Sequence, residues 1–322
     1  MAPRRFAEHI GPHALGELVP RGARERMSAP RRPEGWIAPG PAPAGPQGRP
    51  DLEPAPDEDL SYLAGDWRIF QHRRGHRWSL DDLVTAYVAI RALPPDVPYR
   101  ALDLGCGLGS VLLLVAWALP RAEVTGIEAQ ADRAAMGRRS IAYNGIADRA
   151  RIVDGDLRAW EAPSHAFDLI TGTPPYFPRG TGTESELPHA MPCRFELRGG
   201  PEAYLAVAAT ALAPGGRIAL CSSILQRARI PAAATASALA ITEHWDIIPR
   251  AGKTPLLCVD VLVADTSGAA SPTAATRHEL VVRDVAGQWT PAFRAVRTAL
   301  GMPSGAVRSV GSPPVVPNRR AR

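Results

Sequence analysis

Two short segments of the sequence contain residue types suited to ligand binding and group transfer. The first, Arg100-Ala-Leu-Asp-Leu-Gly-Cys-Gly-Leu-Gly109, joins an apolar run to three glycines. Because Gly105, Gly107 and Gly109 have no Cβ, the backbone can turn sharply there and approach a flat ligand closely. A helix expected from about Ser110 would offer its unpaired N–H groups to polar atoms. The pattern predicts a nucleoside-binding turn between a buried parallel strand and a helix.

The spacing of these glycines indicates which nucleoside cofactor the turn binds. A dinucleotide fingerprint reads G-x-G-x-x-G, whereas Ser110 occupies the last of those positions here. Asp103 lies inside the strand, two residues before Gly105. The resulting D-x-G-x-G-x-G pattern resembles motif I of the class I S-adenosylmethionine (SAM) methyltransferases. The resemblance implies SAM as cofactor, with Asp103 and the three glycines at its site.

Two further acids follow the next strands at positions where a nucleoside needs acceptors. Val124-Thr-Gly-Ile-Glu128 reads as the second strand, and its terminal acid lies 23 positions beyond Gly105. A carboxylate at this point can accept hydrogen bonds from both ribose hydroxyls, so Glu128 is predicted to bind the ribose. Asp156 follows the third strand and is placed to accept from the exocyclic amine of adenine. The alternatives are a surface charge at Glu128 and a solvated turn carboxylate at Asp156.

The second informative segment is Phe167-Asp-Leu-Ile-Thr-Gly-Thr-Pro-Pro-Tyr-Phe-Pro178, in which an apolar strand runs directly into two prolines. Pro174 and Pro175 fix the backbone and lack N–H donors, so nearby carbonyl groups are expected to be free to accept. An amine held between the Thr173 side chain and the Pro174 carbonyl would direct its lone pair at a sulfonium methyl group. Tyr176 offers a ring on which a planar substrate can stack. The alternative interpretation is a rigid turn that ends a strand.

Thr-Pro-Pro-Tyr resembles the N/D/S-P-P-Y/F/W motif of methyltransferases that act on amino groups conjugated to π systems. The wider pattern resembles the bacterial tRNA (adenine-N6) methyltransferase family that modifies the adenine beside the anticodon of a valine tRNA. Four segments carry it over about residues 60–265, with a weaker match to about 301: 77–83, 103–109, 173–176 and 193–200.

This family resemblance implies a tRNA or other RNA substrate and catalytic roles for Thr173, Pro174, Pro175 and Tyr176. It also implies that Asp81 lines the methionine end of the cofactor site and that Thr173 lies beside the cofactor. The family usually has Asn where this chain has Thr173. A threonine hydroxyl can still accept one hydrogen bond, but it is shorter and points differently.

The surrounding pattern predicts an α/β fold, which the resemblance specifies as the class I methyltransferase Rossmann-like seven-stranded sheet with a terminal antiparallel hairpin. Ser79 is a natural N-cap with acids in the next turn, so a helix is expected from there. Residues 67–78 read as two short strands around a turn at 74–75. Segments 243–248 and 256–263 read as the terminal hairpin, and 278–300 as a further strand, turn and short helix.

The domain organisation follows from composition. Residues 1–57 are rich in Pro, Gly, Ala and Arg and are predicted to be a disordered arm, with order beginning near Leu60. The methyltransferase domain is expected over 58–265, a small strand–helix addition over 266–301 and a basic flexible tail over 302–322. Of the net charge of +5, the first 50 and the last 21 residues carry +4 each, which leaves −3 for residues 51–301. Basic arms can bind phosphates, but a general bias toward Arg explains them as well.

Other patterns exclude several classes of site. The four cysteines lie far apart without a C-x-x-C pair, so neither zinc nor a disulfide framework is predicted. His244 and His278 have no partners at ligand spacing, and no metal is expected. The sequence shows no signal peptide and no membrane-spanning run, so a cytoplasmic protein is expected. Residues 179–198 read as a substrate lid, in which Arg194 and Arg198 either contact phosphate or pair with Glu196 or Glu202.

Methyl transfer is expected to be a direct displacement in which the protein positions the reactants and needs no strong base. An RNA substrate would have to bring its adenine out of the base stack to reach Tyr176. Three alternatives remain open: a protein glutamine N5-methyltransferase, a methyltransferase for a small metabolite, and a non-catalytic SAM-binding protein. Thr173 is the main argument for the last of these.

Overall fold

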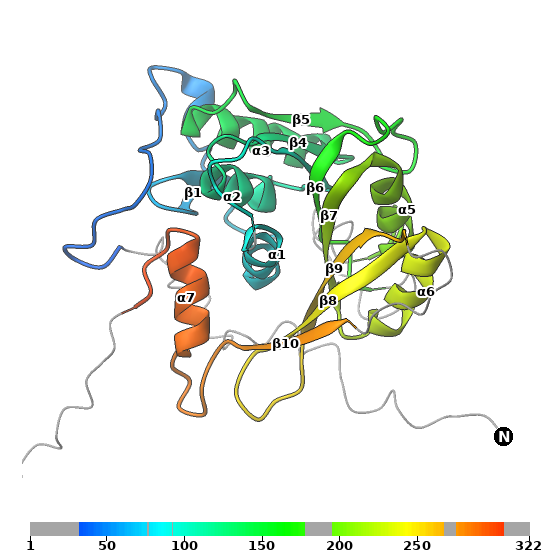
Figure 1. Cartoon of the computed structure of the whole chain (residues 1–322). Helices are drawn as coiled ribbons and strands as arrows, with labels where there is room; N and C mark the ends of the chain where they lie inside the picture. Colours follow the sequence, from blue (N-terminus) through cyan, green and yellow to red (C-terminus); the bar gives the residue numbers. More distant parts are fainter. Residues whose placement is uncertain (1–31, 76, 92, 178–194, 267–274, 306–322) are drawn as a thin grey trace, which may run out of the picture.

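The computed structural model of the chain describes residues 32–305 apart from 76, 92, 178–194 and 267–274. Within this part a single large sheet has the strand order β10-β8-β9-β7-β6-β3-β4-β5 (Figure 1). β9 is antiparallel to both of its neighbours, and the other pairs are parallel. The strands are β3 (Arg100–Leu104), β4 (Glu123–Glu128), β5 (Ala150–Asp154), β6 (Phe167–Gly172), β7 (Leu212–Ser223), β8 (Leu239–Ile248), β9 (Leu257–Ala264) and β10 (Thr276–Val281).

This arrangement confirms the α/β class and the terminal antiparallel hairpin, but the expected count of seven strands is wrong. β10 pairs in parallel with β8 and becomes an eighth strand of the described sheet. The segment predicted to be a separate C-terminal addition therefore extends the main sheet. The sequence did not indicate that β10 joins the main sheet, because the strand is short and mostly polar. Such a composition is compatible with an edge strand, which needs only one buried face.

Helices cover both faces of the sheet (Figure 1). α1 (Leu80–Ile90), α2 (Ser110–Ala118) and α3 (Ala131–Asn144) lie on one face, and α5 (Pro201–Ala211) and α6 (Ile230–Ala236) on the other. α7 (Pro291–Ala299) packs against β10 and α1. Two short 3-10 helices are η2 (Pro50–Leu52) and η3 (Arg227–Arg229). Within the described ranges, none of the helices is long and apolar enough to cross a membrane.

The start of α1 follows the sequence prediction. The Ser79 side chain and the Asp82 carboxylate form a capping box, in which the Ser79 N–H donates to Asp82 Oδ2 at 2.8 Å. The capping box thus provides hydrogen-bond partners for the backbone N–H groups of Ser79 and Asp82. α1 carries its acids toward the ends of the parallel strands, where the glycine turn lies.

The N-terminal prediction is wrong for part of the segment. Residues 1–31 lie outside the described residues, but residues 32–57 make defined contacts, including the buried Leu52 and a Gly45 N–H that donates to the Tyr143 carbonyl at 2.9 Å. The Arg139 guanidinium also donates to the carbonyls of Asp51 and Glu53. A proline-rich segment without apolar periodicity can thus be fixed by hydrogen bonds from a neighbouring helix.

The expected hairpin within residues 67–78 is also wrong. β2 (Arg68–His72) is one strand, and its antiparallel partner is β1 (Glu58–Tyr62), which lies in sequence before it. The register aligns Leu60 with Phe70. β1 was missed because Glu, Asp and Ser dominate its five residues.

Candidate functional site

The glycine turn lies at the carboxyl end of β3 and leads directly into α2. Gly105, Gly107 and Gly109 all have positive φ, at +60°, +57° and +78°. L-residues avoid this conformation, so the turn requires glycine. The Cys106 N–H donates to the Ile127 carbonyl at 2.9 Å, which fixes the turn against β4.

Two side chains that the sequence analysis did not select lie against this turn. A Cβ added to Gly105 would collide with the Tyr204 hydroxyl, and one added to Gly107 would come within 2.7 Å of the Arg133 guanidinium. Tyr204 is buried on α5 and also lies against Gly172 at the end of β6. The Arg133 Nε is buried and has no hydrogen-bond partner among the described residues. Arg133 lies in the first turn of α3, shortly after Glu128, and this position in the sequence could have identified it as a residue near the turn.

Glu128 lies directly beside the glycine turn. Its Oε2 accepts from the Gly107 N–H at 2.8 Å and its Oε1 accepts from the Gln130 N–H at 2.7 Å. The residue is only 6% exposed, so the alternative of a surface charge is wrong. The carboxylate is therefore fixed against the backbone of the glycine turn.

Asp156 follows β5, close to Glu128, because the Gly155 N–H donates to the Glu128 carbonyl at 2.9 Å. The Arg158 guanidinium and its backbone N–H both donate to the Asp156 carboxylate. These hydrogen bonds from Arg158 lower the pKa of Asp156. The carboxylate is ionised and partly exposed, and is held by its neighbour rather than free.

Asp103 points away from the open side of the turn. Its carboxylate accepts from the Thr171 hydroxyl at 2.7 Å and from the Leu112 N–H at 3.2 Å. Burial, with a smaller contribution from the charge of Glu128, raises its pKa to about 7. Asp103 therefore ties β3, β6 and α2 together, and its observed contacts are those of a residue that supports the turn.

The two acids at the start of α1 face in different directions. Asp82 Oδ1 accepts from the Ser110 hydroxyl at 2.8 Å, which links α1 to the start of α2. Burial and the adjacent charge of Asp81 raise the pKa of Asp82 to about 8. Asp81 accepts hydrogen bonds from the hydroxyls of Ser79 and Tyr176.

Tyr176 therefore has a contact that the sequence did not predict. Its hydroxyl donates to Asp81 Oδ2 at 2.8 Å and lies 3.5 Å from Cys221 Sγ. Burial and the charge of Asp81 raise the pKa of the phenol well above its usual value. Its ring is partly exposed and packs against the apolar core. One side chain thus connects the Pro-Pro segment to α1, and through Asp82 and Ser110 the chain of contacts reaches the glycine turn.

The two parts of the site meet because β3 and β6 are neighbours. Leu104, the last residue of β3, pairs with Gly172, the last residue of β6. Gly105 and Thr173 come next, so the glycine turn and the Thr-Pro-Pro-Tyr segment leave adjacent strand ends. Within the described residues, no hydrogen bond engages the Thr173 hydroxyl or the Pro174 carbonyl.

The carbonyl of Pro175 is not free, contrary to the expectation for this segment. Gln226 Nε2 donates to it at 2.7 Å, and the same amide donates to Glu196 Oε1 at 2.8 Å. Ser223 donates its hydroxyl to the carbonyl of Tyr176 at 3.4 Å. Gln226 and Ser223 thus support the segment from β7 and the loop after it, and both were missed because they lie about 50 positions away in sequence.

The predicted ion pairs of the lid are different in the structure. Arg194 and most of the predicted lid lie outside the described residues, and Arg198 is exposed. Glu196 and Glu202 both pair with Arg229, at 2.6 Å in each case. The pairing of Arg198 with either acid is therefore wrong.

Several known proteins resemble the chain. A family model described as a methyltransferase domain matches residues 101–178, which extend from β3 to just beyond Tyr176. A tRNA1(Val) (adenine(37)-N6)-methyltransferase of Tolumonas auensis is 26% identical over 200 residues, covering 61% of this chain and 79% of the relative. A release factor glutamine methyltransferase of Caulobacter vibrioides is 33% identical over 139 residues, covering 41% of this chain and 47% of the relative. The chain thus matches less than half the length of this second relative.

The solved structure of a predicted O-methyltransferase from Agrobacterium tumefaciens has the same fold. It aligns with a TM-score of 0.53 and 20% identity and covers 69% of this chain and 98% of that protein. Together with the glycine turn and the methyltransferase-domain match, these similarities identify the chain as a SAM-dependent methyltransferase with a class I, Rossmann-like fold.

Proposed function

We propose that this enzyme methylates the exocyclic N6 amine of an adenine in RNA, with tRNA as the preferred substrate. The observation that carries the proposal is the position of Thr173-Pro-Pro-Tyr176 at the end of β6, beside the glycine turn that ends β3. With SAM at the turn, this arrangement would bring the methyl donor and a planar amine together at adjacent strand ends.

The residues around the glycine turn suit SAM. The three glycines hold the turn in a conformation that other residues avoid, and the Glu128 carboxylate accepts from the Gly107 N–H of this turn. We propose that Glu128 accepts from the ribose hydroxyls, Asp156 from the adenine amine, and that Asp81 lies at the methionine end. When bound, SAM supplies the electrophilic methyl group.

The Thr-Pro-Pro-Tyr segment would position the amine. The Thr173 hydroxyl and the Pro174 carbonyl are unengaged by described residues and can each accept one N–H of a primary amine. With both N–H groups held, the nitrogen lone pair is directed away from the acceptors and toward the methyl carbon. The loss of one proton after transfer restores a neutral amine, so no strong base is required.

Two named relatives support an amine bonded to a trigonal carbon. One acts on adenine N6 and the other on a glutamine, whose amide nitrogen is likewise conjugated. The adenine assignment is preferred because the adenine-N6 relative matches the larger share of this chain, 61% against 41%. Protein glutamine methylation is the second candidate, supported by the higher identity of the shorter match.

The deciding experiment incubates the purified full-length protein and SAM with bulk tRNA, and digests the RNA to nucleosides for mass spectrometry. We expect N6-methyladenosine above the level of a reaction without enzyme. A parallel reaction with methyl-labelled SAM and a protein extract tests glutamine methylation. Label in protein but not in RNA would contradict the adenine assignment, and tight SAM binding with no transfer to either pool would indicate a non-catalytic protein.

Thr173 provides a sharper test of the positioning role. Thr173→Val keeps the side-chain shape but removes the acceptor, so turnover should fall about tenfold, equivalent to ~1.4 kcal/mol for one lost hydrogen bond. Thr210→Val is the matched control, because Thr210 is exposed on α5 and, among the described residues, its hydroxyl donates only to the Ala206 carbonyl. Equal turnover in the two variants would contradict a role for Thr173 in binding the amine.

A further inference from the structure

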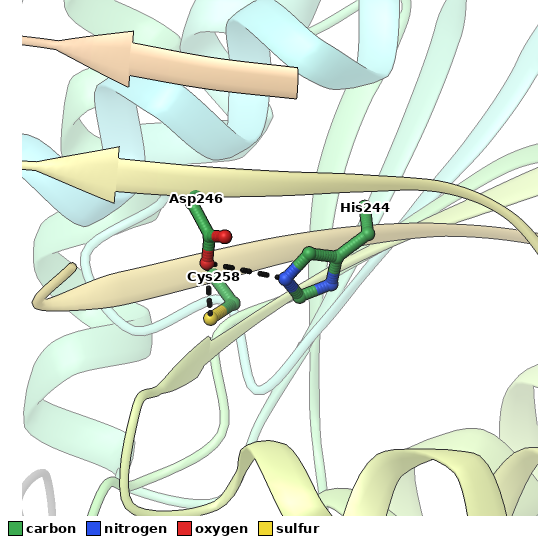
Figure 2. A group of neighbouring side chains, drawn as sticks. All are labelled: His244, Asp246 and Cys258. Carbon is green, nitrogen blue, oxygen red and sulfur yellow. Dashed lines mark hydrogen bonds and ion pairs between the residues drawn. The ribbon is translucent and has the colours of Figure 1, made fainter. Parts of the chain in front are cut away.

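A compact group of side chains on the β8–β9 hairpin has no role in methyl transfer as proposed above. His244 and Asp246 lie on β8, and Cys258 and Asp260 lie opposite them on β9. The register pairs His244 with Asp260 and Asp246 with Cys258, so all four side chains share one face of the sheet. Figure 2 shows His244, Asp246 and Cys258 directed toward one another. One ligand atom from each of these three lies within 4.8 Å of the other two.

The distances within the group match those around a four-coordinate ion. His244 Nε2 lies 3.2 Å from Asp246 Oδ1, and Cys258 Sγ lies 3.6 Å from the same oxygen. Zinc bonds of about 2.0–2.1 Å to nitrogen and oxygen and about 2.3 Å to sulfur, at tetrahedral angles, place such ligand atoms about 3.3 Å and 3.6 Å apart. The ligand atoms of His244 and Cys258 lie within 4.8 Å of each other, and a tetrahedral ion requires them to be about 3.6 Å apart.

Asp260 holds the His244 ring in the way that carboxylates hold metal-binding histidines. The Nδ1 of His244 lies 2.7 Å from Asp260 Oδ1, and Asp260 is only 2% exposed. A carboxylate on one ring nitrogen fixes the ring and leaves the other nitrogen free to bind a metal. Here the nitrogen left over, Nε2, is the one that faces Asp246 and Cys258.

A further observation comes from β7. Ser222 pairs with Cys258 across the β7–β9 ladder, so its side chain lies on the same face, beside the group. The Ser222 hydroxyl is buried and has no hydrogen-bond partner among the described residues. Leaving a buried hydroxyl without a partner is unfavourable, because the group has lost its hydrogen bonds to water. A water held as a fourth ligand by a bound ion would give this hydroxyl a partner.

Asp246 has a competing contact that any ion must displace. Arg227 Nη1 donates to Asp246 Oδ1 at 3.1 Å, and this is the oxygen that faces His244 and Cys258. The Arg227 side chain is 33% exposed and lies on the short η3 helix, so it can move to the other carboxylate oxygen or into solvent. Burial, with the charges of Asp246 and Asp260, raises the pKa of Cys258 to about 12, so an ion must also displace the thiol proton.

We propose that His244 Nε2, Asp246 Oδ1 and Cys258 Sγ bind one zinc ion, with water at the fourth position. A mixed nitrogen, oxygen and sulfur donor set selects zinc over magnesium or calcium, which prefer oxygen alone. The site lies toward the carboxyl end of β7, where Ser223 and Gln226 support the Pro-Pro-Tyr segment. The ion would join β8 to β9 through ligands from both strands. This replaces the expectation from sequence that His244 binds no metal.

The first test measures metal in the full-length protein without reference to methyl transfer. Protein purified without chelators should contain about one zinc per chain by elemental mass spectrometry. Metal-free protein titrated with cobalt should develop the charge-transfer absorption of a cobalt–thiolate bond and saturate at one equivalent. A protein that retains no zinc and shows no cobalt–thiolate band would overturn the proposal, whatever its activity.

Variants then locate the site. Cys258→Ser should abolish the cobalt–thiolate band, and His244→Ala should weaken cobalt binding at least about tenfold through loss of one ligand. Cys221→Ser is the matched control, because Cys221 is also buried but lies on the opposite face of the sheet. A band that persists in Cys258→Ser, or disappears only in Cys221→Ser, would place the thiolate elsewhere and overturn the assignment. Should Cys258→Ser fail to fold, His244→Ala still tests the site, because undiminished cobalt binding in that variant would overturn the assignment.

Discussion

The two halves of the site are built in different ways, although they share one edge of the sheet. On the proposed cofactor side, the glycine turn, Glu128 and Asp156 come from three consecutive strands, and their contacts join residues 2 to 21 positions apart. On the substrate side, Thr173-Pro-Pro-Tyr176 depends on Gln226, Ser223 and Asp81, which lie 47 to 95 positions away. The cofactor side is thus set by local sequence, whereas the substrate side is set by tertiary contacts.

This difference predicts that substitutions on the two sides separate cofactor affinity from turnover. Residues beside the glycine turn should change binding of S-adenosylhomocysteine, whereas residues that support the Pro-Pro-Tyr segment should change turnover alone. Calorimetry with this ligand and initial rates with RNA measure the two quantities independently.

The largest effect is expected for Glu128→Ala. The variant loses the proposed acceptor of the ribose hydroxyls and leaves the Gly107 and Gln130 N–H groups without their partner. Affinity for S-adenosylhomocysteine should fall about 100-fold, equivalent to ~3 kcal/mol for charged hydrogen bonds. Glu123→Ala, at the exposed start of the same strand, is the control and should bind normally. Normal binding by Glu128→Ala would remove the basis for the ribose assignment.

Tyr176→Ala should have the next largest effect, on turnover. Loss of a stacking surface costs about 1–3 kcal/mol per base, so turnover should fall about 10- to 100-fold while cofactor affinity changes little. Tyr176→Phe separates the ring from the hydroxyl that donates to Asp81. It should retain most of the activity if stacking is the role of the ring. A loss of cofactor affinity in Tyr176→Ala as large as its loss of turnover would erase the distinction between the two sides.

Gln226→Ala tests the support of the Pro-Pro-Tyr segment. It removes the donor to the Pro175 carbonyl and to Glu196, so the segment loses one fixed point. Turnover should fall about fivefold, equivalent to ~1 kcal/mol for one net hydrogen bond, with cofactor affinity unchanged. Gln288→Ala, at an exposed turn before α7, is the matched control. Wild-type kinetics in Gln226→Ala would show that the segment needs no such support.

The smallest expected effect is a dependence of cofactor preference on pH. The raised pKa values of Asp103, about 7, and Asp82, about 8, mean that both carboxyls lose protons between pH 6 and pH 9. Their added negative charge should favour SAM, whose sulfonium is positive, over S-adenosylhomocysteine, which has a neutral sulfur. The ratio of their affinities should move toward SAM by about threefold as the pH rises, equivalent to ~0.7 kcal/mol of charge–charge interaction.

Calorimetric titrations with both ligands at pH 6 and pH 9 measure this ratio, and the shared amino-acid portion cancels. Asp82→Asn should reduce the change with pH, because one of the two titrating groups is gone. A ratio that stays constant, or moves toward S-adenosylhomocysteine, would contradict an electrostatic effect of Asp103 and Asp82 on the bound sulfonium.

Local sequence predicted the glycine turn, the start of α1 and β4 because each of these elements carries its own signal. The glycines define the turn by backbone conformation alone, Ser79 defines the start of α1 by capping, and Val124 to Glu128 form a strand whose last residue is the acid. Each of these signals occupies a few consecutive residues. They can therefore be recognised without knowing which strands become neighbours in the sheet.

The sequence by itself determined the α/β class, the glycine turn and the order of its acids, because backbone sterics and helix capping act within a few residues. Only the tertiary structure decided that Tyr176 bonds to Asp81, that Gln226 occupies the Pro175 carbonyl, that β10 joins the sheet, and that His244, Asp246 and Cys258 converge. These contacts depend on strand order and register. Strand order and register follow from the packing of the whole sheet against its helices, and no short segment encodes them.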